Sequence, residues 1–155
     1  MFGEMLVCFG GMQMLVNGDM LGLEKVTGPG YTILGEAEHP KELDFQKVRF
    51  VTMLLDGEEC ITGEDRLSRL KKCDLLRLCA GTFLFLMENQ HLIPESWKEV
   101  DGNTRFIYFD GTVLERSNGD RCVMFMFWLS GRWTFSVRWL NNLCNNLDCS
   151  AIAVM

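Results

Sequence analysis

The sequence predicts an α+β protein in which a pair of helices packs on a C-terminal antiparallel β-meander. Residues 62–89 hold a capped amphipathic segment followed by a more apolar one, which indicates two helices. From residue 104 onward, short apolar runs are separated by residue pairs that contain glycine, which is typical of antiparallel strands joined by tight turns. The chain has 155 residues, 48% hydrophobic and 23% charged, which is enough to bury a core without a metal or a disulfide. We expect an N-terminal segment over residues 1–46 and a single α+β domain over residues 47–155.

The N-terminal segment is compatible with a β-hairpin and a connector. Residues 5–16 are apolar around a Gly10-Gly11 break, and Asn17-Gly18 then offers the residue pair of a type I′ turn before a second apolar run. Residues 27–46 are rich in glycine, proline and acids, which is typical of a connector.

A strand and a capped helix are expected next. Residues 47–55 are apolar and β-branched and run into Asp56-Gly57, which predicts a strand followed by a tight turn. Thr62 can cap a helix, with Asp65 as its reciprocal partner. Leu67 and Leu70 then share one face of this helix, whereas its basic residues are expected in solvent; these are Arg66, Arg69, Lys71 and Lys72.

A second helix is expected to begin at Asp74 and to run over residues 75–90. Its residues are apolar on all sides, so we expect it to be buried. Pro94 marks its end or the loop beyond it.

The last third of the chain predicts four strands, at residues 105–109, 112–116, 121–129 and 132–140. They are separated by three residue pairs suited to tight turns, Asp110-Gly111, Asn118-Gly119 and Ser130-Gly131. A two-residue loop at Ser130-Gly131 sets the register by counting outward, so that Trp128 faces Trp133, Met126 faces Phe135, Met124 faces Val137 and Cys122 faces Trp139.

This register divides the aromatic residues between two faces. The face with Trp128, Trp133, Phe135 and Trp139 is expected to pack under the helices as core. The reverse face sets aromatic residues beside arginines, a combination favoured in interface hot spots, and is the candidate binding surface. Its candidate binding residues are Phe125, Phe127, Arg132 and Arg138. Stacking on single-stranded nucleic acid is the third interpretation of the aromatic stretch.

Net charge argues against nucleic acid. The chain carries 15 basic and 21 acidic residues, a net charge of −6, so it has no overall surplus of the cations that neutralise phosphates. Its N-terminal apolar stretch is too short to span a bilayer. We therefore expect a cytoplasmic protein without a membrane segment.

Metal and catalytic motifs are missing from the sequence. The seven cysteines form no Cys-x-x-Cys pair, and neither His39 nor His91 lies within a few residues of one, so we expect no metal and no cofactor. Neither Gly-x-x-x-x-Gly-Lys-Ser/Thr nor Gly-x-Ser-x-Gly occurs. The sequence leans against an enzyme. It leaves open a ligand-binding domain or an enzyme whose site is assembled from scattered residues such as Glu88, His91 and Trp97.

An Ile-Pro-x-x-Trp junction occurs at Ile93, Pro94 and Trp97, and Gly111-Thr112-Val113 stands at the start of the aromatic meander. On these motifs, the chain from about residue 47 to the C-terminus resembles a group of small hypothetical bacterial proteins. The group has no established function, so the resemblance implies the architecture alone. We expect a small cytosolic interaction or regulatory accessory protein, encoded by a bacterium or its mobile elements, that binds a protein partner through one face of its sheet.

Overall fold

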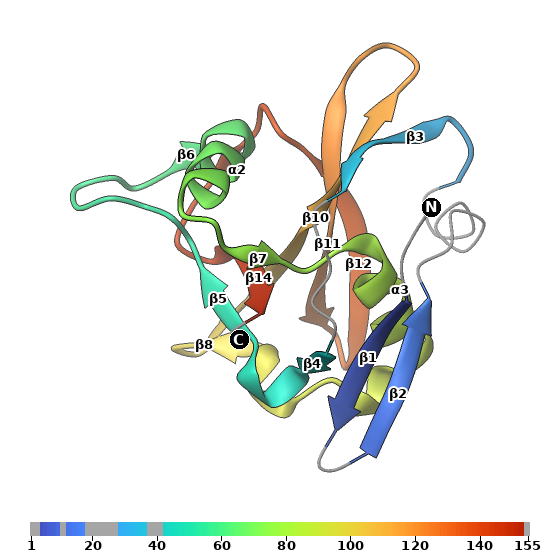
Figure 1. Ribbon diagram of the computed structural model, residues 1–155. Coiled ribbons are helices and arrows are strands. Elements are labelled where there is room, and N and C mark those ends of the chain that lie inside the picture. Colours follow the sequence, from blue (N-terminus) through green and yellow to red (C-terminus); the bar gives the residue numbers. More distant parts are fainter. Residues whose placement is uncertain (1–3, 10–11, 18–27, 37–41, 154–155) are drawn as a thin grey trace.

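A mixed sheet of seven strands forms the centre of the molecule (Figure 1). The computed structural model describes residues 4–9, 12–17, 28–36 and 42–153. Five strands lie side by side in the order β12 (Arg132–Trp139), β11 (Arg121–Leu129), β10 (Phe106–Arg116), β14 (Asp148–Ala153) and β5 (Arg49–Val51). Two more join at the sides: β3 (Tyr31–Glu36) pairs with β10, and β7 (Leu76–Arg77) pairs with β14. The α+β class is confirmed. The sheet is mixed rather than antiparallel throughout, because β14 lies parallel to β10.

The predicted register of β11 and β12 is confirmed. All four expected pairs are present, from Cys122 opposite Trp139 to Trp128 opposite Trp133. The turn between the strands has φ values of 52° at Ser130 and 79° at Gly131, as a type I′ turn requires.

The expected turn at Asp110-Gly111 is wrong, because β10 runs unbroken through both residues. Gly111 instead allows two backbone segments to lie close together. Its N–H donates to the carbonyl of Leu78 at 2.8 Å, and a Cβ added to it would lie 2.6 Å from the carbonyl oxygens of Arg77 and Leu78. Glycine at this position therefore lets the backbone at Arg77 and Leu78 approach β10 closely. The register of β10 against β11 shifts between Phe109 and Leu114.

Helix α2 (Gly63–Lys72) begins where the sequence predicts. The side chain of Thr62 accepts a hydrogen bond from the N–H of Asp65 at 3.1 Å. One expectation is wrong: the Arg66 side chain is buried rather than solvated, with 1% of its surface exposed. Its guanidinium is held by acidic and aromatic groups of β10 and by β14, which no spacing along the helix reveals.

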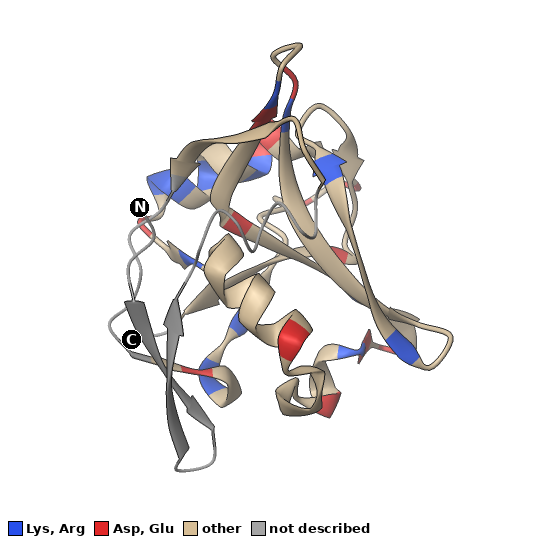
Figure 2. Cartoon of the chain, turned by 90° about the vertical axis from the view of Figure 1, so that its right-hand side faces the viewer, with Lys and Arg blue, Asp and Glu red and all other residues tan. Residues whose placement is uncertain are grey.

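Helix α3 (Ala80–Glu88) begins six residues later than predicted. Residues 76 and 77 form β7 instead, because Arg77 pairs with Ile152 of β14. The expectation that this helix is buried is confirmed, since Ala80 through Leu86 are all buried. Figure 2 shows the contrast between the helices: basic residues lie along α2, whereas α3 is uncharged up to its C-terminal end.

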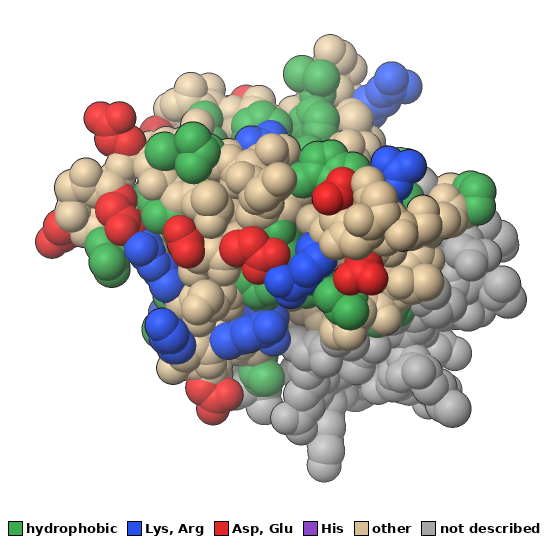
Figure 3. All heavy atoms as spheres, turned by 90° about the horizontal axis from the view of Figure 1, so that it is seen from above, with side chains coloured by type: hydrophobic (Ala, Val, Ile, Leu, Met, Phe, Trp, Pro, Cys, Tyr) green, Lys and Arg blue, Asp and Glu red, His purple; other side chains and the backbone are tan. Residues whose placement is uncertain are grey.

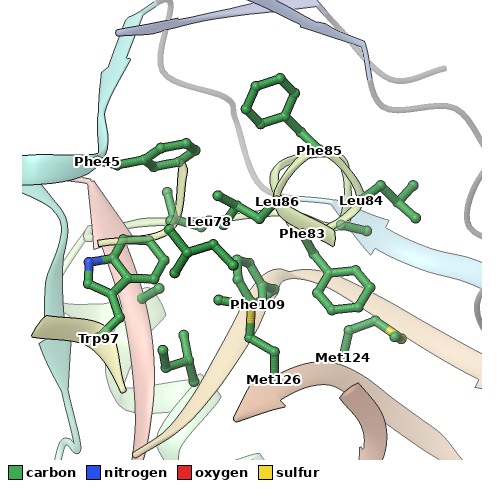
Figure 4. Close-up of a cluster of buried hydrophobic side chains, with 14 of the residues drawn as sticks. Phe45, Leu78, Phe83, Leu84, Phe85, Leu86, Trp97, Phe109, Met124 and Met126 are labelled. Carbon is green, nitrogen blue, oxygen red and sulfur yellow. The ribbon is translucent and has the colours of Figure 1, made fainter. Parts of the chain in front are cut away.

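The two helices lie on opposite faces of the sheet and do not form a pair on one face. Alternate residues of a strand point to opposite faces. Ile107 and Phe109 of β10 therefore join the core with α3, and Tyr108 joins a second cluster with Leu67 of α2. In the larger cluster Phe83 of α3 points toward Phe109 and Met124 (Figure 4), and the rings of Phe83 and Phe109 are 5.4 Å apart.

The N-terminal segment holds an antiparallel strand pair, but both of its strands lie almost entirely within the run expected to form the first strand alone. β1 (Glu4–Phe9) pairs with β2 (Met12–Asn17), and β4 (Glu42–Asp44) joins β1 in parallel. Asn17 pairs with Glu4 and so belongs to β2, whereas Gly18 of the expected Asn17-Gly18 turn and the apolar run after it lie outside the described residues. β3 pairs with β10, and Phe45 packs against Trp97, so β3 and Phe45 contribute to the packed structure.

The remaining elements are short. They are β6 (Ile61–Thr62), β8 (Glu99–Val100), β9 (Asn103–Thr104), β13 (Leu143–Cys144) and the 3-10 helices η1 (Phe45–Lys47), η2 (Gln90–Leu92) and η3 (Glu95–Trp97). The expected strand over residues 47–55 is reduced to β5, and the expected turn at Asp56-Gly57 is present, with a φ of 85° at Gly57. Among the described residues, no helix is long and apolar enough to cross a membrane.

Candidate functional site

The predicted binding face is covered at one end and open at the other. Phe125 is buried, with 8% of its surface exposed, and its ring stacks on Tyr108 at 5.0 Å and on Phe127 at 5.6 Å. The expectation that Phe125 presents a binding surface is therefore wrong: the cluster under α2 covers it. Phe127 is half-buried, and Leu129 at the end of β11 is exposed.

The two predicted arginines lie at opposite ends of β12. Six residue steps along an extended strand place them roughly 20 Å apart, so they do not form one compact site. Arg132 is exposed. Arg138 is half-buried and donates from Nη2 to the carbonyl of Leu143 at 2.7 Å. The structure therefore joins these residues as a row along one strand, with Phe127 beside it on β11.

β12 is an edge strand, because among the described residues it pairs with β11 alone. In a two-residue hairpin the residues that flank the loop, here Leu129 and Arg132, form a hydrogen-bonded pair, and the pattern then alternates. The N–H and C=O groups of Trp133, Phe135 and Val137 consequently point away from β11. These are the groups with which a further strand would pair.

The side chains of this edge are sorted by face. Arg132, Thr134, Ser136 and Arg138 share one face of β12, and Trp133, Phe135, Val137 and Trp139 share the other. Ser136 is exposed and 39% of the surface of Phe135 is exposed, so both faces are accessible in the middle of the strand. The edge strand thus carries a basic and polar row on one face and an apolar row on the other.

A buried polar network ties α2 to the centre of the sheet. The Nε atom of Arg66 lies 3.5 Å from the carboxylate of Asp110, and its guanidinium lies 4.2 Å from the ring centre of Tyr108. The Tyr108 hydroxyl donates to Asp148 at 2.9 Å, and the Ser150 hydroxyl donates to Asp110. Burial, followed by the nearby Asp148, raises the pKa of Tyr108 above its ordinary value, so this hydroxyl stays a donor. The network is enclosed and positions β10, β14 and α2.

A cationic pocket lies beside this network, at the junction of α2, β3, β7, β10 and the start of β11. Its volume is about 230 Å³, and it is lined by Leu34, Gly35, Lys71, Arg77, Gly111, Val113 and Arg121. Three of the seven lining residues are basic and none is acidic. On the face of the molecule seen in Figure 3, several basic side chains gather in one area with acidic ones beside them. Sequence reasoning missed this pocket, because its basic residues lie far apart along the chain.

The scattered residues considered for an alternative site are not brought together. Glu88 and His91 are exposed, whereas Trp97 is 2% exposed and packs in the core, 5.7 Å from Phe45. Among the described residues, no three metal-ligating side chains gather to hold an ion. Burial raises the pKa of Cys122 to about 11 and that of Cys149 to about 12, so both thiols stay protonated at neutral pH.

Scans against protein-family models, curated proteins and solved structures gave no match. The resemblance to small hypothetical bacterial proteins accordingly stays a prediction. Two surfaces of the molecule offer binding chemistry, the β12 edge and the cationic pocket.

Proposed function

We propose that this protein is an interaction module that binds an extended, acidic segment of a protein partner along the free edge of β12. The observation that carries this proposal is the unpaired edge, whose outward N–H and C=O groups can take up one more strand. Addition of a strand to an exposed sheet edge is a recurring mode of peptide recognition, in which main-chain hydrogen bonds supply affinity and alternate side chains supply specificity.

The two rows of β12 define the chemistry of the partner. A strand laid beside β12 would place alternate side chains next to the basic row and the others next to the apolar row. Acidic residues complement Arg132 and Arg138, and β-branched residues complement Phe135 and Val137. The partner segment is therefore an extended run in which acidic and apolar residues alternate.

A second copy of the chain is a poorer occupant of this edge. Antiparallel pairing of two β12 strands centred on Phe135 would set Arg132 of each copy opposite Arg138 of the other. Like charges directly opposite one another destabilise a strand pair. The edge thus favours an acidic partner over self-association.

A designed peptide tests the proposal directly. The probe is a fluorescein-labelled octapeptide in which Glu alternates with Val, and its binding is followed by fluorescence anisotropy at low and at physiological salt. We expect saturable binding that weakens with added salt, since surface charges are screened. Two control peptides are matched to it: Lys replaces Glu in one, and every second backbone nitrogen is methylated in the other. The lysine peptide and the methylated peptide should not bind, because the first reverses the charge and the second cannot form the ladder.

Protein variants locate the binding to β12. Arg132→Glu reverses an exposed charge of the basic row, and Lys72→Glu makes the same change on an exposed residue of α2. We expect Arg132→Glu to weaken peptide binding about tenfold, because it removes a charge-assisted contact with the acidic peptide. Lys72→Glu should leave peptide binding within about twofold of the wild type. Equal binding by the methylated peptide, equal losses in the two variants, or a dimer that forms without peptide in sedimentation analysis would overturn the proposal.

A further inference from the structure

The positive charges of the cationic pocket are only partly neutralised by nearby carboxylates. Among the described residues, no carboxylate lies within 4 Å of the charged groups of Lys71 or Arg77. Arg121 is paired through Nη1 with Glu64, at 2.7 and 2.8 Å, and its Nε atom is buried without a partner. Within the described part of the chain, Glu64 is thus the one acid within ion-pair distance of these three cations.

Arg77 is the most constrained of the three. Its Nη1 atom donates to the backbone carbonyl of Asp110 at 3.2 Å, which holds the guanidinium at the pocket wall. Burial lowers the pKa of Arg77, partly offset by the nearby Asp110, because a desolvated cation loses hydration that its surroundings do not fully replace. An anion in the pocket would supply the missing interaction.

The rest of the lining suits a small anion. Gly35 and Gly111 add no side chain, and Gly35 has no atom within 4 Å of the position that a Cβ would take. A volume of about 230 Å³ falls below the range of roughly 300–1,000 Å³ that is usual for sites of drug-sized ligands. The pocket therefore has room for a compact anionic group and is too small for a nucleotide.

We propose that this pocket binds a tetrahedral oxyanion of the phosphate class, held by Lys71, Arg77 and Arg121. Arginine presents several N–H donors in a planar fork that matches phosphate oxygens, and lysine adds a point charge. The three residues come from α2, β7 and β11 and approach from different elements, which suits a ligand with acceptor oxygens on all sides. This site is independent of the β12 edge, since no residue of β12 lines it.

Calorimetric titration of the full chain with inorganic phosphate at constant ionic strength tests the site. Lys71→Gln removes one cation from an exposed position at the end of α2, so the fold should tolerate it. Lys72→Gln is the matched control, because Lys72 is also exposed, carries the same charge and does not line the pocket. We expect saturable phosphate binding, about tenfold weaker in Lys71→Gln and within about twofold of wild type in Lys72→Gln, from the contribution of a hydrogen bond to a charged group.

Parallel titrations define the ligand. Acetate should bind at least about tenfold more weakly than phosphate, because it is planar and carries less charge. Glycerol phosphate is included beside inorganic phosphate; tighter binding of the ester assigns the pocket to a phosphorylated metabolite, and tighter binding of the free ion assigns it to phosphate itself. Three results would overturn the proposal: no saturable binding up to about 10 mM, equal losses in the two lysine variants, or acetate binding as tightly as phosphate.

Discussion

Replacing Gly111 with alanine should destabilise the protein through a clash between backbones. The added Cβ would lie 2.6 Å from the carbonyl oxygens of Arg77 and Leu78, whereas ordinary van der Waals contact begins at 3.4 Å. The two strands would have to separate by nearly 1 Å, which would also lengthen the 2.8 Å hydrogen bond from Gly111 to Leu78 beyond useful range. Overpacking costs about 1–3 kcal/mol and a lost hydrogen bond about 1 kcal/mol. The lower entropy of the unfolded alanine chain offsets about 0.4–1 kcal/mol, so the net loss is about 2 kcal/mol.

Urea unfolding followed by tryptophan fluorescence measures this loss as a shift of the midpoint at an unchanged m-value. Gly35→Ala is the matched control, because Gly35 lies on β3, borders the same pocket and has no atom within 4 Å of its added Cβ. Its stability should be unchanged or higher by about 0.5 kcal/mol. If Gly111→Ala loses less than about 0.5 kcal/mol, or if the two variants shift alike, the close approach of the backbone at Arg77 and Leu78 to Gly111 is refuted.

Three further predictions concern buried and paired groups. Arg66→Met should lower the free energy of unfolding by about 3–5 kcal/mol, because it leaves the carboxylate of Asp110 buried without its cation, and a loss under about 1 kcal/mol in urea unfolding would contradict the network. The hydrogen bonds from Arg69 and then from the backbone of Leu55 lower the pKa of Glu58 to about 2 from 4.5. The stability that Glu58 contributes is therefore complete above about pH 4.5 and is lost as the pH falls toward 2. The free energy of unfolding of the wild type, relative to that of Glu58→Gln, should decrease over this pH range. If this relative free energy is the same from pH 5 to pH 2, the ion pair is contradicted. Burial raises the pKa of Cys149 to about 12, so a thiol-specific reagent at pH 8 should modify it only after unfolding, whereas rapid modification in the native protein, mapped by mass spectrometry, would refute its burial.

Local patterns predicted several elements correctly. The cap at Thr62, the pairing of β11 with β12 and the turn at Ser130-Gly131 each depend on a few neighbouring residues. The same local rules failed at Gly111, because a glycine that permits a turn and a glycine that permits a close approach look alike in sequence. They also failed at Arg66, since helical spacing reports which face a residue occupies and not which partners reach that face.

The candidate site was predictable only in part. The division of the β11–β12 hairpin into two faces followed from register, so the row of Arg132 and Arg138 was found in advance. The burial of Phe125 was not, because it depends on α2 packing against that face while α3 packs against the other. The cationic pocket left no signal at all, since Lys71, Arg77 and Arg121 meet only where β3 and β10 pair.

By itself, the sequence determined the fold class, the capped start of α2 and the side-chain order along β11 and β12. These features arise from interactions within about a dozen residues, which propensity, capping and turn chemistry describe. Only the tertiary structure decided which face each helix covers, that β14 joins β10 in parallel, and that β12 is left as an edge. Those features depend on contacts between distant segments, whose free energies come from burial and complementary packing and leave no periodic trace in the chain.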